Sequence, residues 1–437
     1  MSRLTTFVAP QPDVALMRRL VPVNRWLNLH GLPLLRDLPW FGRLPGFSGL
    51  TDIRRWHVSA EDEARLRQTV RPEHVCFIGP NHPEFFTDWM IDKELSARFA
   101  PRMASWATHT VVNGMGARMQ RFWLRNNLIA QIPGEGGQHA KRHSVDWARQ
   151  GHAVLLHPEG AVGWHADWIA PLFTGIAELA MAAYREEQAS GGGKPVYIQP
   201  VLWKLRFCRD AERAVRKELL WTARRLNLSV TQDAALPEQW FELQSGVLER
   251  EADKLGLPVP SRRQHSYFAR RESLMRGIAA RLDALCPQMD AALPLPRRWS
   301  RALRESGQES LALAGKPLLA AWERLTRIPP EAYDKPLIAL EHIAESVKRV
   351  RQDYCKGRLR DTLNAFIPRP AAARDLYLRV PAPVDIGQWL AEGHAAEPAG
   401  LAEHLRGLMQ AELDALLSRL HAEQPYWRLS NPLYSQT

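Results

Sequence analysis

The chain has 437 residues, of which 45% are hydrophobic and 24% charged, as in ordinary globular proteins. This composition excludes a wholly disordered chain, a collagen-like fibre and a small disulfide scaffold, and the length predicts two or three domains. The formal net charge of +11 favours nucleic acid, anionic lipid or phosphorylated small molecules as partners. Because Trp prefers the boundary between apolar and aqueous phases, the 16 Trp residues point toward a membrane surface.

The expected location follows from the Cys residues and from the apolar runs. The four Cys residues are far apart and form no CxxC pair, which suits a reducing compartment. No apolar run approaches the roughly 18 residues of a spanning helix. The N-terminal residues also lack the features of a signal peptide. We therefore expect a protein on the cytoplasmic side, peripherally associated with the membrane.

Residues 1–60 form a basic segment rich in Trp and Pro. Its prolines prevent one long helix. In one interpretation the segment is interfacial, with apolar side chains in lipid and Arg side chains on headgroups. In the other it packs across the neighbouring domain as a Pro-rich wrap. The side chains assigned to the interface are Trp26, Leu35, Trp40 and Phe41, with Arg25, Arg36 and Arg43 on the headgroups.

Residues 61–208 alternate between short apolar runs, typical of buried strands, and longer helical patterns. The expected strands are 74–80, 127–133, 152–158 and 194–207, and the expected helices are 85–100, 140–151 and 172–188. This alternation predicts an α/β fold, with a mostly parallel or mixed sheet flanked by helices.

The character of the chain changes after residue 208. Residues 209–370 are charged and strongly helical, with Pro-containing joints between the helices. Residues 371–437 contain a strand-like run at 375–387 and a final helix at 400–423. We therefore expect a large, mainly helical region that is either an insertion or a C-terminal addition.

A His and an Asp follow the first expected strand, within the segment GPNHPEFFTDWM. An imidazole at such a place can take a proton from a hydroxyl, while a carboxylate fixes its tautomer and stabilises the imidazolium. The candidates are His82 as the base and Asp88 as its partner, with Asn81 in the turn.

Two further patterns lie at or near strands. In the Pro-Glu-Gly sequence after the third strand, Glu159 can hold a hydroxyl-rich substrate and Gly160 permits a positive φ angle. A plain turn is the alternative interpretation. The third pattern is the apolar strand VYIQPVLWKL, which Pro200 interrupts.

The order and spacing of these patterns resemble the glycerolipid acyltransferase family, which contains the lysophosphatidic-acid and glycerol-3-phosphate acyltransferases. The family signature is Asn-His-x4-Asp, then Phe-Pro-Glu-Gly-Thr-Arg-Ser, then a strand with a Val-Pro-Val-like core. The likeness covers about residues 70–207 and identifies the chain as a divergent member.

The resemblance implies roles for the matching residues. His82 corresponds to the catalytic base and Asp88 to its partner. Glu159 and Gly160 correspond to the acceptor-binding turn, and Pro200 to the proline of the third element. Together with Asn81, they are the expected substrate-binding residues. The segment LYLRVPAPVDIG also resembles a late closing strand of the family. On that basis, residues 209–370 are an insertion.

The sequence departs from the family pattern in three ways. Five residues separate His82 from Asp88 where the family has four, so a turn or bulge absorbs one residue, or Glu84 orients the imidazole instead. Ala161 and Val162 replace the Thr-Arg after Pro-Glu-Gly, and no Arg follows the strand at 127–133.

In the family, the Arg residues that are absent here bind the acceptor phosphate. Other cations are therefore needed if the acceptor of this protein carries a phosphate. The candidate substitutes are Lys141, Arg142, Arg125 and Lys93. The alternative interpretation is ordinary surface charge.

The resemblance implies acyl transfer from acyl-CoA or an acyl-carrier protein to a hydroxyl of a glycerolipid or lysophospholipid, as in phospholipid biosynthesis. The expected partners are the acyl thioester, the lipid acceptor and an anionic membrane surface. Neither a nucleic-acid partner nor a cofactor or metal is expected, because no recognised nucleic-acid module or HExxH motif occurs.

Two alternatives remain open. One is a non-catalytic lipid-binding protein with a degenerate acyltransferase fold. The other is a metal-dependent hydrolase that uses a His cluster, which consists of His139, His143, His152, His157 and His165.

Overall fold

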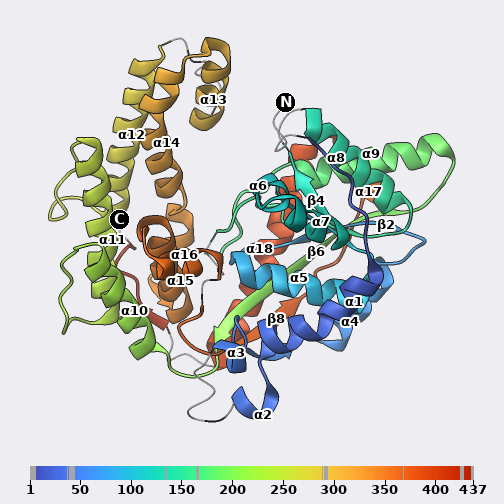
Figure 1. The fold of residues 1–437 in the computed structure, drawn as a ribbon, viewed down its shortest axis with the longest axis horizontal. Coiled ribbons are helices and arrows are strands. Elements are labelled where there is room, and N and C mark those ends of the chain that lie inside the picture. The colour runs from blue at the N-terminus through green and yellow to red at the C-terminus, as the bar shows by residue number, and fades with distance from the viewer. Residues whose placement is uncertain are drawn as a thin grey trace. The chain divides into compact units, whose positions relative to one another are not determined.

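The computed structural model describes residues 6–36, 38, 45–132, 135–163, 167–287, 289, 294–367, 369–423 and 428–434. The chain divides into two compact units (Figure 1). Unit 1 comprises Met1–Arg209 and Phe366–Gln424, so it combines the blue-to-green and the red segments. Unit 2 comprises Asp210–Ala365 and Pro425–Thr437.

Unit 1 is built around an eight-stranded sheet with the order β1-β8-β6-β2-β5-β3-β4, in which β9 also pairs with β6. The central strand β2 runs parallel to both β6 and β5, and β3 and β4 continue in parallel. A mixed sheet flanked by helices confirms the predicted α/β class. The bounds of these strands are β2 Val75–Pro80, β3 Ala104–Thr108, β4 Leu128–Gln131, β5 Val154–Leu155 and β6 Val196–Phe207.

The remaining strands show at which point of the sequence most of unit 2 is inserted into unit 1. Strand β8 (Arg374–Arg379) pairs antiparallel with the second half of β6, from Leu202 to Phe207. Strand β1 (Ile53–His57) is parallel to β8, and β9 (Val384–Asp385) pairs with the start of β6. Because β6 and β8 are neighbours in one sheet, the chain leaves this sheet after β6, forms most of unit 2 and then returns.

Alternating side chains of β2 pack on opposite faces of the sheet, as the pleat of a strand requires. Val75 and Phe77 belong to one buried cluster, whereas Cys76 and Ile78 belong to another. The first cluster is completed by α8 (Glu135–Arg149), α9 (Gly175–Ser190), α17 (Ile386–Ala391) and α18 (Pro398–Glu423). The second is completed by α4 (Ala60–Thr69), α5 (Phe85–Phe99) and the π-helical segment η1 (Asn24–His30).

The N-terminal segment both packs on unit 1 and exposes apolar side chains. Helix α1 (Val14–Val23) leads into η1, where the Asn24 side chain donates to the Met90 carbonyl at 2.9 Å. Trp26 is 46% exposed and Leu34 87%. The short helices that follow are α2 (Pro33–Arg36) and α3 (Pro45–Ser48).

The other predicted interfacial residues have mixed environments. Arg25 binds the buried Glu94 carboxylate at 2.9 Å, and Leu35 and Arg36 are half-buried. Trp40, Phe41 and Arg43 lie outside the described residues. Within the described ranges, no helix combines the length and hydropathy that crossing a bilayer requires.

Unit 2 is mainly helical, with one small antiparallel pair of strands, β7 and β10. Its helices are α10 (Glu212–Arg225), α11 (Leu236–Leu255), α12 (Tyr267–Leu285), α13 (Leu295–Ser306), α14 (Glu309–Thr326), η3 (Pro330–Tyr333), α15 (Leu340–Tyr354) and α16 (Leu359–Phe366). The strands are β7 (Leu337–Ala339) and β10 (Arg428–Ser430). In unit 1, α6 (His109–Gly114) and α7 (Ala117–Arg125) connect β3 to β4.

Candidate active site

His82 and Glu159 follow the carboxyl ends of β2 and β5, which are neighbouring parallel strands. Ligands of open α/β sheets bind at this edge, because loops from several strands converge there. The Glu159 Oε1 atom accepts the main-chain N–H of His82 at 2.7 Å. The fold therefore brings two of the predicted site residues into direct contact.

The His82 imidazole contacts Asp88, as the sequence predicts. The Nδ1 atom of His82 lies 2.9 Å from Oδ2 of Asp88. The side chain of Asp88 is fully buried, whereas that of His82 is 15% exposed. Since Nδ1 is engaged by the carboxylate, Nε2 is the ring nitrogen left to exchange a proton with a substrate.

The additional residue between His82 and Asp88 is absorbed before α5 begins. Pro83 forms a bend and Glu84 is extended, with φ −136° and ψ 146°, so the helix starts at Phe85. Asp88, in the first turn, then faces back toward the loop and accepts the Glu84 main-chain N–H at 2.7 Å. The longer spacing therefore still delivers the carboxylate to the imidazole.

Glu84, the rival partner for His82, is committed elsewhere. Its carboxylate accepts a hydrogen bond from Arg374 at 2.5 Å and another from the Thr87 hydroxyl at 2.6 Å. Arg374 belongs to β8, so this buried ion pair ties the loop after β2 to the returning strand. We assign Asp88 rather than Glu84 as the group that orients the imidazole.

Three donors surround the Asp88 carboxylate, which suits its ionised form. Besides His82 and the Glu84 amide, the indole N–H of Trp203 donates to Oδ1 at 2.8 Å. Burial and the nearby Glu84 carboxylate nevertheless raise the pKa of Asp88 well above its usual value, although the hydrogen bonds from Trp203 and the Glu84 amide oppose that rise. The three hydrogen bonds hold the Asp88 carboxylate in one orientation against His82.

A second His–Asp pair, which the sequence analysis missed, lies beside the first. The rings of His157 and His82 stack with centroids 4.0 Å apart and planes at 18°. His157 contacts the Asn81 carbonyl through Nδ1 at 2.9 Å and Asp92 through Nε2 at 3.0 Å. Because both ring nitrogens face acceptors, this geometry favours a protonated His157.

The two histidines have opposite protonation tendencies. Burial lowers the pKa of His82 well below its usual value, and the charge of His157 lowers it further. Burial also opposes charge on His157, but Asp92 and the Asn81 carbonyl outweigh this cost and raise its pKa above the usual value. Both shifts favour a neutral His82 beside a protonated His157, and a general base must be neutral before it accepts a proton.

Glu159 and Gly160 support the loop that carries His82. The second carboxylate oxygen of Glu159 accepts the Ala170 N–H at 3.0 Å, and burial raises the pKa of Glu159 to about 7 although both N–H donors oppose this. Gly160 has φ +70°, and a Cβ atom there would lie 2.4 Å from the Phe173 ring. The Pro-Glu-Gly sequence therefore anchors the His82 main chain as well as forming a turn.

Asn81 and Pro200 have structural places between β2 and β6. The Asn81 side chain both donates to the Trp203 carbonyl and accepts its N–H, each at 3.0 Å, and is 2% exposed. Pro200 is opposite Gly79, at the point of β6 between its pairings with β9 and β8. In this structure both residues align the strands, whereas the sequence analysis assigned them to substrate binding.

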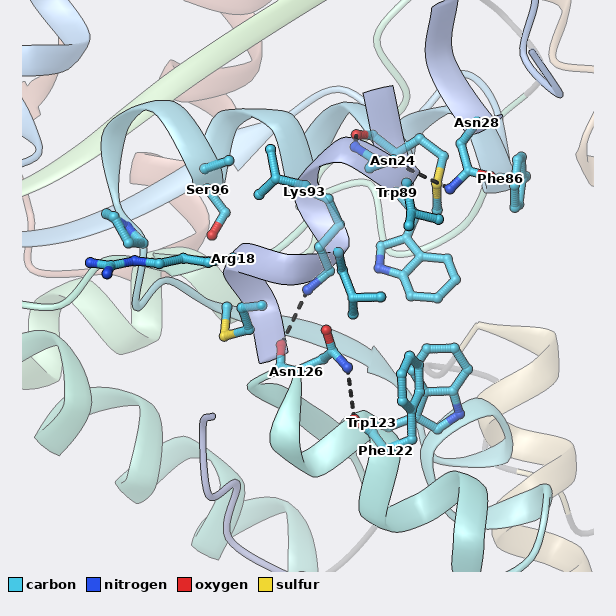
Figure 2. Close-up of a pocket in the computed structure, with 17 residues that line it drawn as sticks. Arg18, Asn24, Asn28, Phe86, Trp89, Lys93, Ser96, Phe122, Trp123 and Asn126 are labelled. Atoms are coloured by element: carbon cyan, nitrogen blue, oxygen red, sulfur yellow. Dashed lines mark hydrogen bonds between the residues drawn. The ribbon is translucent and has the colours of Figure 1, made fainter. Parts of the chain in front are cut away.

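Two of the candidate phosphate-binding cations lie near α1 and α7. The Lys93 ammonium donates to the Asn126 carbonyl at 3.1 Å and lines an apolar pocket (Figure 2). The Arg125 guanidinium pairs with Asp13, which caps α1. Neither of these contacts involves the His82 loop.

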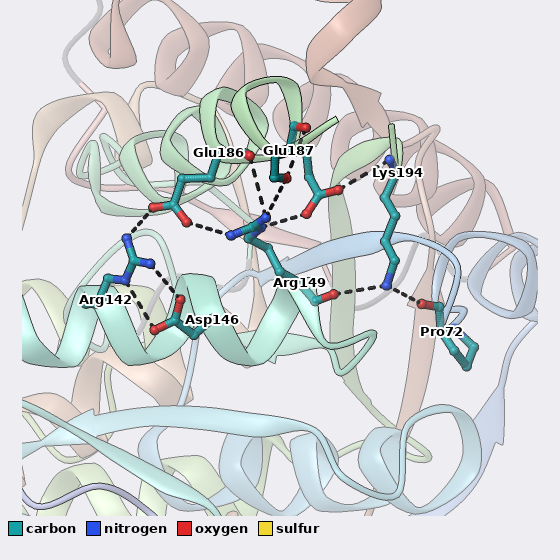
Figure 3. A network of polar contacts seen from close by, with 8 residues as sticks. Pro72, Arg142, Asp146, Arg149, Glu186, Glu187 and Lys194 are labelled. Carbon is teal, nitrogen blue, oxygen red and sulfur yellow. Dashed lines mark hydrogen bonds and ion pairs between the residues drawn. The ribbon is translucent and has the colours of Figure 1, made fainter. Parts of the chain in front are cut away.

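The other two cations, Lys141 and Arg142, lie on α8 and pair with acids. Lys141 contacts Glu178 at 2.5 Å. Arg142 pairs with Asp146 at 3.1 Å and with Glu186 at 2.6 Å, in a network that joins α8 to α9 (Figure 3). The expectation that these cations grip a substrate phosphate is therefore not supported by their positions, because nearby carboxylates already neutralise them.

The described members of the His cluster do not converge on one metal site. Among the described residues, no group of three or more His, Cys, Asp or Glu side chains is arranged to hold a metal ion. His165 lies outside the described residues, and His143 and His152 each pack against Trp147. Cys76 is buried in β2, where burial raises the pKa of its thiol to about 12.

No known protein-family model matches the sequence, and no curated protein is significantly similar to it. The class that the fold and site define is an α/β protein with a partly exposed His bound to a buried Asp at the carboxyl edge of its sheet. The likeness to glycerolipid acyltransferases rests on the motif residues themselves.

Proposed function

We propose that the protein transfers an acyl chain from an acyl thioester to the hydroxyl of a glycerolipid or lysophospholipid. The observation that carries the proposal is the 2.9 Å contact between Nδ1 of His82 and the fully buried carboxylate of Asp88. Because Nδ1 contacts Asp88, the Nε2 atom of the partly exposed imidazole is left for a substrate. The imidazole lies at the edge of the sheet where α/β proteins bind ligands.

In this mechanism Nε2 of His82 takes the proton of the acceptor hydroxyl, and the oxygen attacks the thioester carbonyl carbon. The C–S bond of the tetrahedral intermediate then breaks, and the proton passes from His82 to the leaving thiolate. The products are an acyl ester and a free thiol. No covalent acyl-enzyme is formed, and no further co-reactant is consumed.

His157 supports this reaction through its charge. Both of its N–H groups are occupied by Asn81 and Asp92, so it has no donor to offer a substrate oxygen. Its positive charge next to His82 favours the neutral base and the negative charge that develops on the attacked carbonyl. Glu159 is a positioning residue, because it holds the His82 main chain and not its ring.

The N-terminal segment would place this site at a membrane from the cytoplasmic side. Exposed apolar side chains gather in residues 23–38 and are accompanied by exposed Arg18 and Arg19. An apolar surface with flanking cations matches an anionic lipid interface. The exposed apolar residues are Val23, Trp26, Leu27, Leu32, Leu34 and Leu38.

The test is thioester turnover by the purified full chain, together with lipid mass spectrometry of cells that carry the same variants. His82→Ala should lower turnover by about 10²–10⁴-fold and remove one acylated lipid species. The matched control is His265→Ala, at an exposed position in unit 2, which should leave both unchanged. Unaltered turnover by His82→Ala would reject the catalytic role and favour the lipid-binding alternative.

A further inference from the structure

A second candidate site lies in a pocket of about 340 Å³ among α1, η1, α5 and α7 (Figure 2). Its walls are largely apolar, with Leu20 and Val21 from α1, Trp89 from α5, and Phe122 and Trp123 from α7. This volume is at the lower end of the range of about 300–1,000 Å³ for ligand pockets. It therefore suits one alkyl chain and not a two-chain lipid.

Helix α5 separates this pocket from the His82 site. Asp88 and Asp92 are one turn apart and face the two histidines. Phe86, Trp89 and Lys93 recur at the spacing of another face of the helix and line the pocket. None of His82, Asp88 or Glu159 lines it, so a ligand there is not a ligand of the proposed reaction centre.

Two Trp side chains, Trp89 and Trp123, form the aromatic wall of the pocket. Trp123 is 8% exposed, and its buried indole N–H has no hydrogen-bond partner among the described residues; the same is true of the Trp89 indole N–H. These two rings meet edge to face with centroids 5.0 Å apart. The chain itself covers both N–H atoms, so the polar contact available to a ligand in this pocket comes from Lys93 instead.

The same pocket contains a cation that is available to a ligand. Of the three donors of the Lys93 ammonium, one is used by the Asn126 carbonyl at 3.1 Å. Figure 2 shows the Lys93 side chain extending between α5 and α7, with Arg18 also at the pocket. An ammonium surrounded by apolar walls is compensated best by an anionic oxygen group.

We propose that this pocket binds a single-chain anionic amphiphile, with its alkyl chain against the aromatic and aliphatic walls and its anionic oxygens on Lys93. A fatty carboxylate and an alkyl phosphate share this chemistry. The site is independent of acyl transfer, because it lies across α5 from the base.

The experiment is isothermal titration calorimetry of the full chain with decanoate, decyl phosphate and neutral 1-decanol, each below its aggregation concentration. Decanoate or decyl phosphate should bind about tenfold or more tightly than decanol. The tighter of the two anions identifies whether the natural ligand is a free fatty acid or a phosphorylated lipid. Equal affinities for decanol and both anions would overturn the proposal.

Two variants test the place of binding. Lys93→Met should weaken anion binding about tenfold or more and leave decanol binding nearly unchanged, whereas Ala97→Phe should abolish both by filling the pocket. The matched control is Lys217→Met, at an exposed Lys on α10. Anion binding that Lys93→Met leaves intact, or that Lys217→Met weakens equally, would contradict the proposal.

The result is distinguishable from the outcome for acyl transfer. His82→Ala should bind decanoate as the unaltered protein does, whether or not it turns over a thioester. A large loss of decanoate affinity in His82→Ala would show that the ligand occupies the reaction centre and would overturn the separate site.

Discussion

Asp88 and Asp92 lie one helical turn apart on α5, and each binds a different histidine of one stacked pair. A single helix face therefore orients His82 and stabilises charge on His157. Residues four positions apart on a helix are neighbours, so this arrangement needs only that the start of α5 be fixed. The Glu84–Arg374 ion pair and the Asp88–Glu84 hydrogen bond fix that start.

Asp88→Asn should lower thioester turnover by about 10²-fold or more, because the amide does not hold the required imidazole tautomer or stabilise the imidazolium. Steady-state turnover of the purified variant measures this, with its thermal unfolding recorded alongside. Asp146→Asn, in the network between α8 and α9, is the control and should keep full activity. Equal activity in the two variants would contradict the assigned dyad.

His157→Gln should raise the pKa of His82, because it removes the positive charge that helps to lower that pKa. A base with a higher pKa is protonated at higher pH, so the acidic limb of the pH–rate profile should move upward. NMR titration of the His82 ring gives the same shift directly. A limb that stays in place or moves downward would show that His157 is not cationic beside the base.

Glu159→Gln should reduce the free energy of unfolding by about 1–3 kcal/mol, since an amide cannot accept from both the His82 and the Ala170 N–H groups. Denaturant unfolding measures the difference. The variant should also lose turnover, because the main chain of His82 is released.

The stability difference between the unaltered protein and Glu159→Gln should depend on pH. Burial raises the pKa of Glu159 from 4.5 to about 7, so the folded state binds more protons than the unfolded state in this window. The contribution of this group to stability is therefore present below pH 4.5 and is lost as the pH rises through about 7. Relative to Glu159→Gln, the unaltered protein should lose stability between pH 4.5 and 7. An advantage that grows over this range would refute the raised pKa.

Decanoate affinity should fall as the pH rises above about 8 and should do so less in Lys93→Met. Burial lowers the pKa of Lys93 to about 8, and only the protonated ammonium attracts the carboxylate. Calorimetry at pH 7 and pH 9.5 measures both proteins. The same loss in both proteins would assign the pH dependence to another group.

Leu34→Glu should weaken co-sedimentation with anionic vesicles, because a Leu that is 87% exposed is replaced by an anion that the surface repels. The expected loss of affinity is about tenfold, comparable to the burial of one Leu side chain. Leu313→Glu is matched in chemistry, since Leu313 is 65% exposed in unit 2. Vesicle binding that both substitutions weaken equally would reject the N-terminal segment as the contact surface.

Local patterns predicted the α/β class and the contact of His82 with Asp88. The runs at 74–80 and 194–207 are rich in apolar residues, which is typical of strands buried on both faces, and they contain β2 and β6. The His–Asp contact is local, because the loop and the first turn of α5 suffice to form it.

Contacts between distant segments were not predictable in the same way. The partner of His157 is 65 residues earlier in the chain, and that of Lys141 is 37 residues later. Nothing in the local sequence distinguishes a cation that is paired with a carboxylate from one that is available to a substrate. The sequence therefore could not show which of the four candidate cations are paired. The run at 152–158 was expected as one strand, whereas β5 contains only Val154 and Leu155 because the chain then turns to present His157 and Glu159.

The position of unit 2 between β6 and β8 has a consequence for biogenesis. During synthesis, the ribosome must complete the whole inserted helical region before the segment containing β8 emerges to join its neighbour. Closing a loop costs chain entropy that grows with its length, and a folded insertion whose ends lie together reduces that cost. Mutations that unfold the insertion should therefore delay maturation of the eight-stranded sheet even when they touch none of its residues.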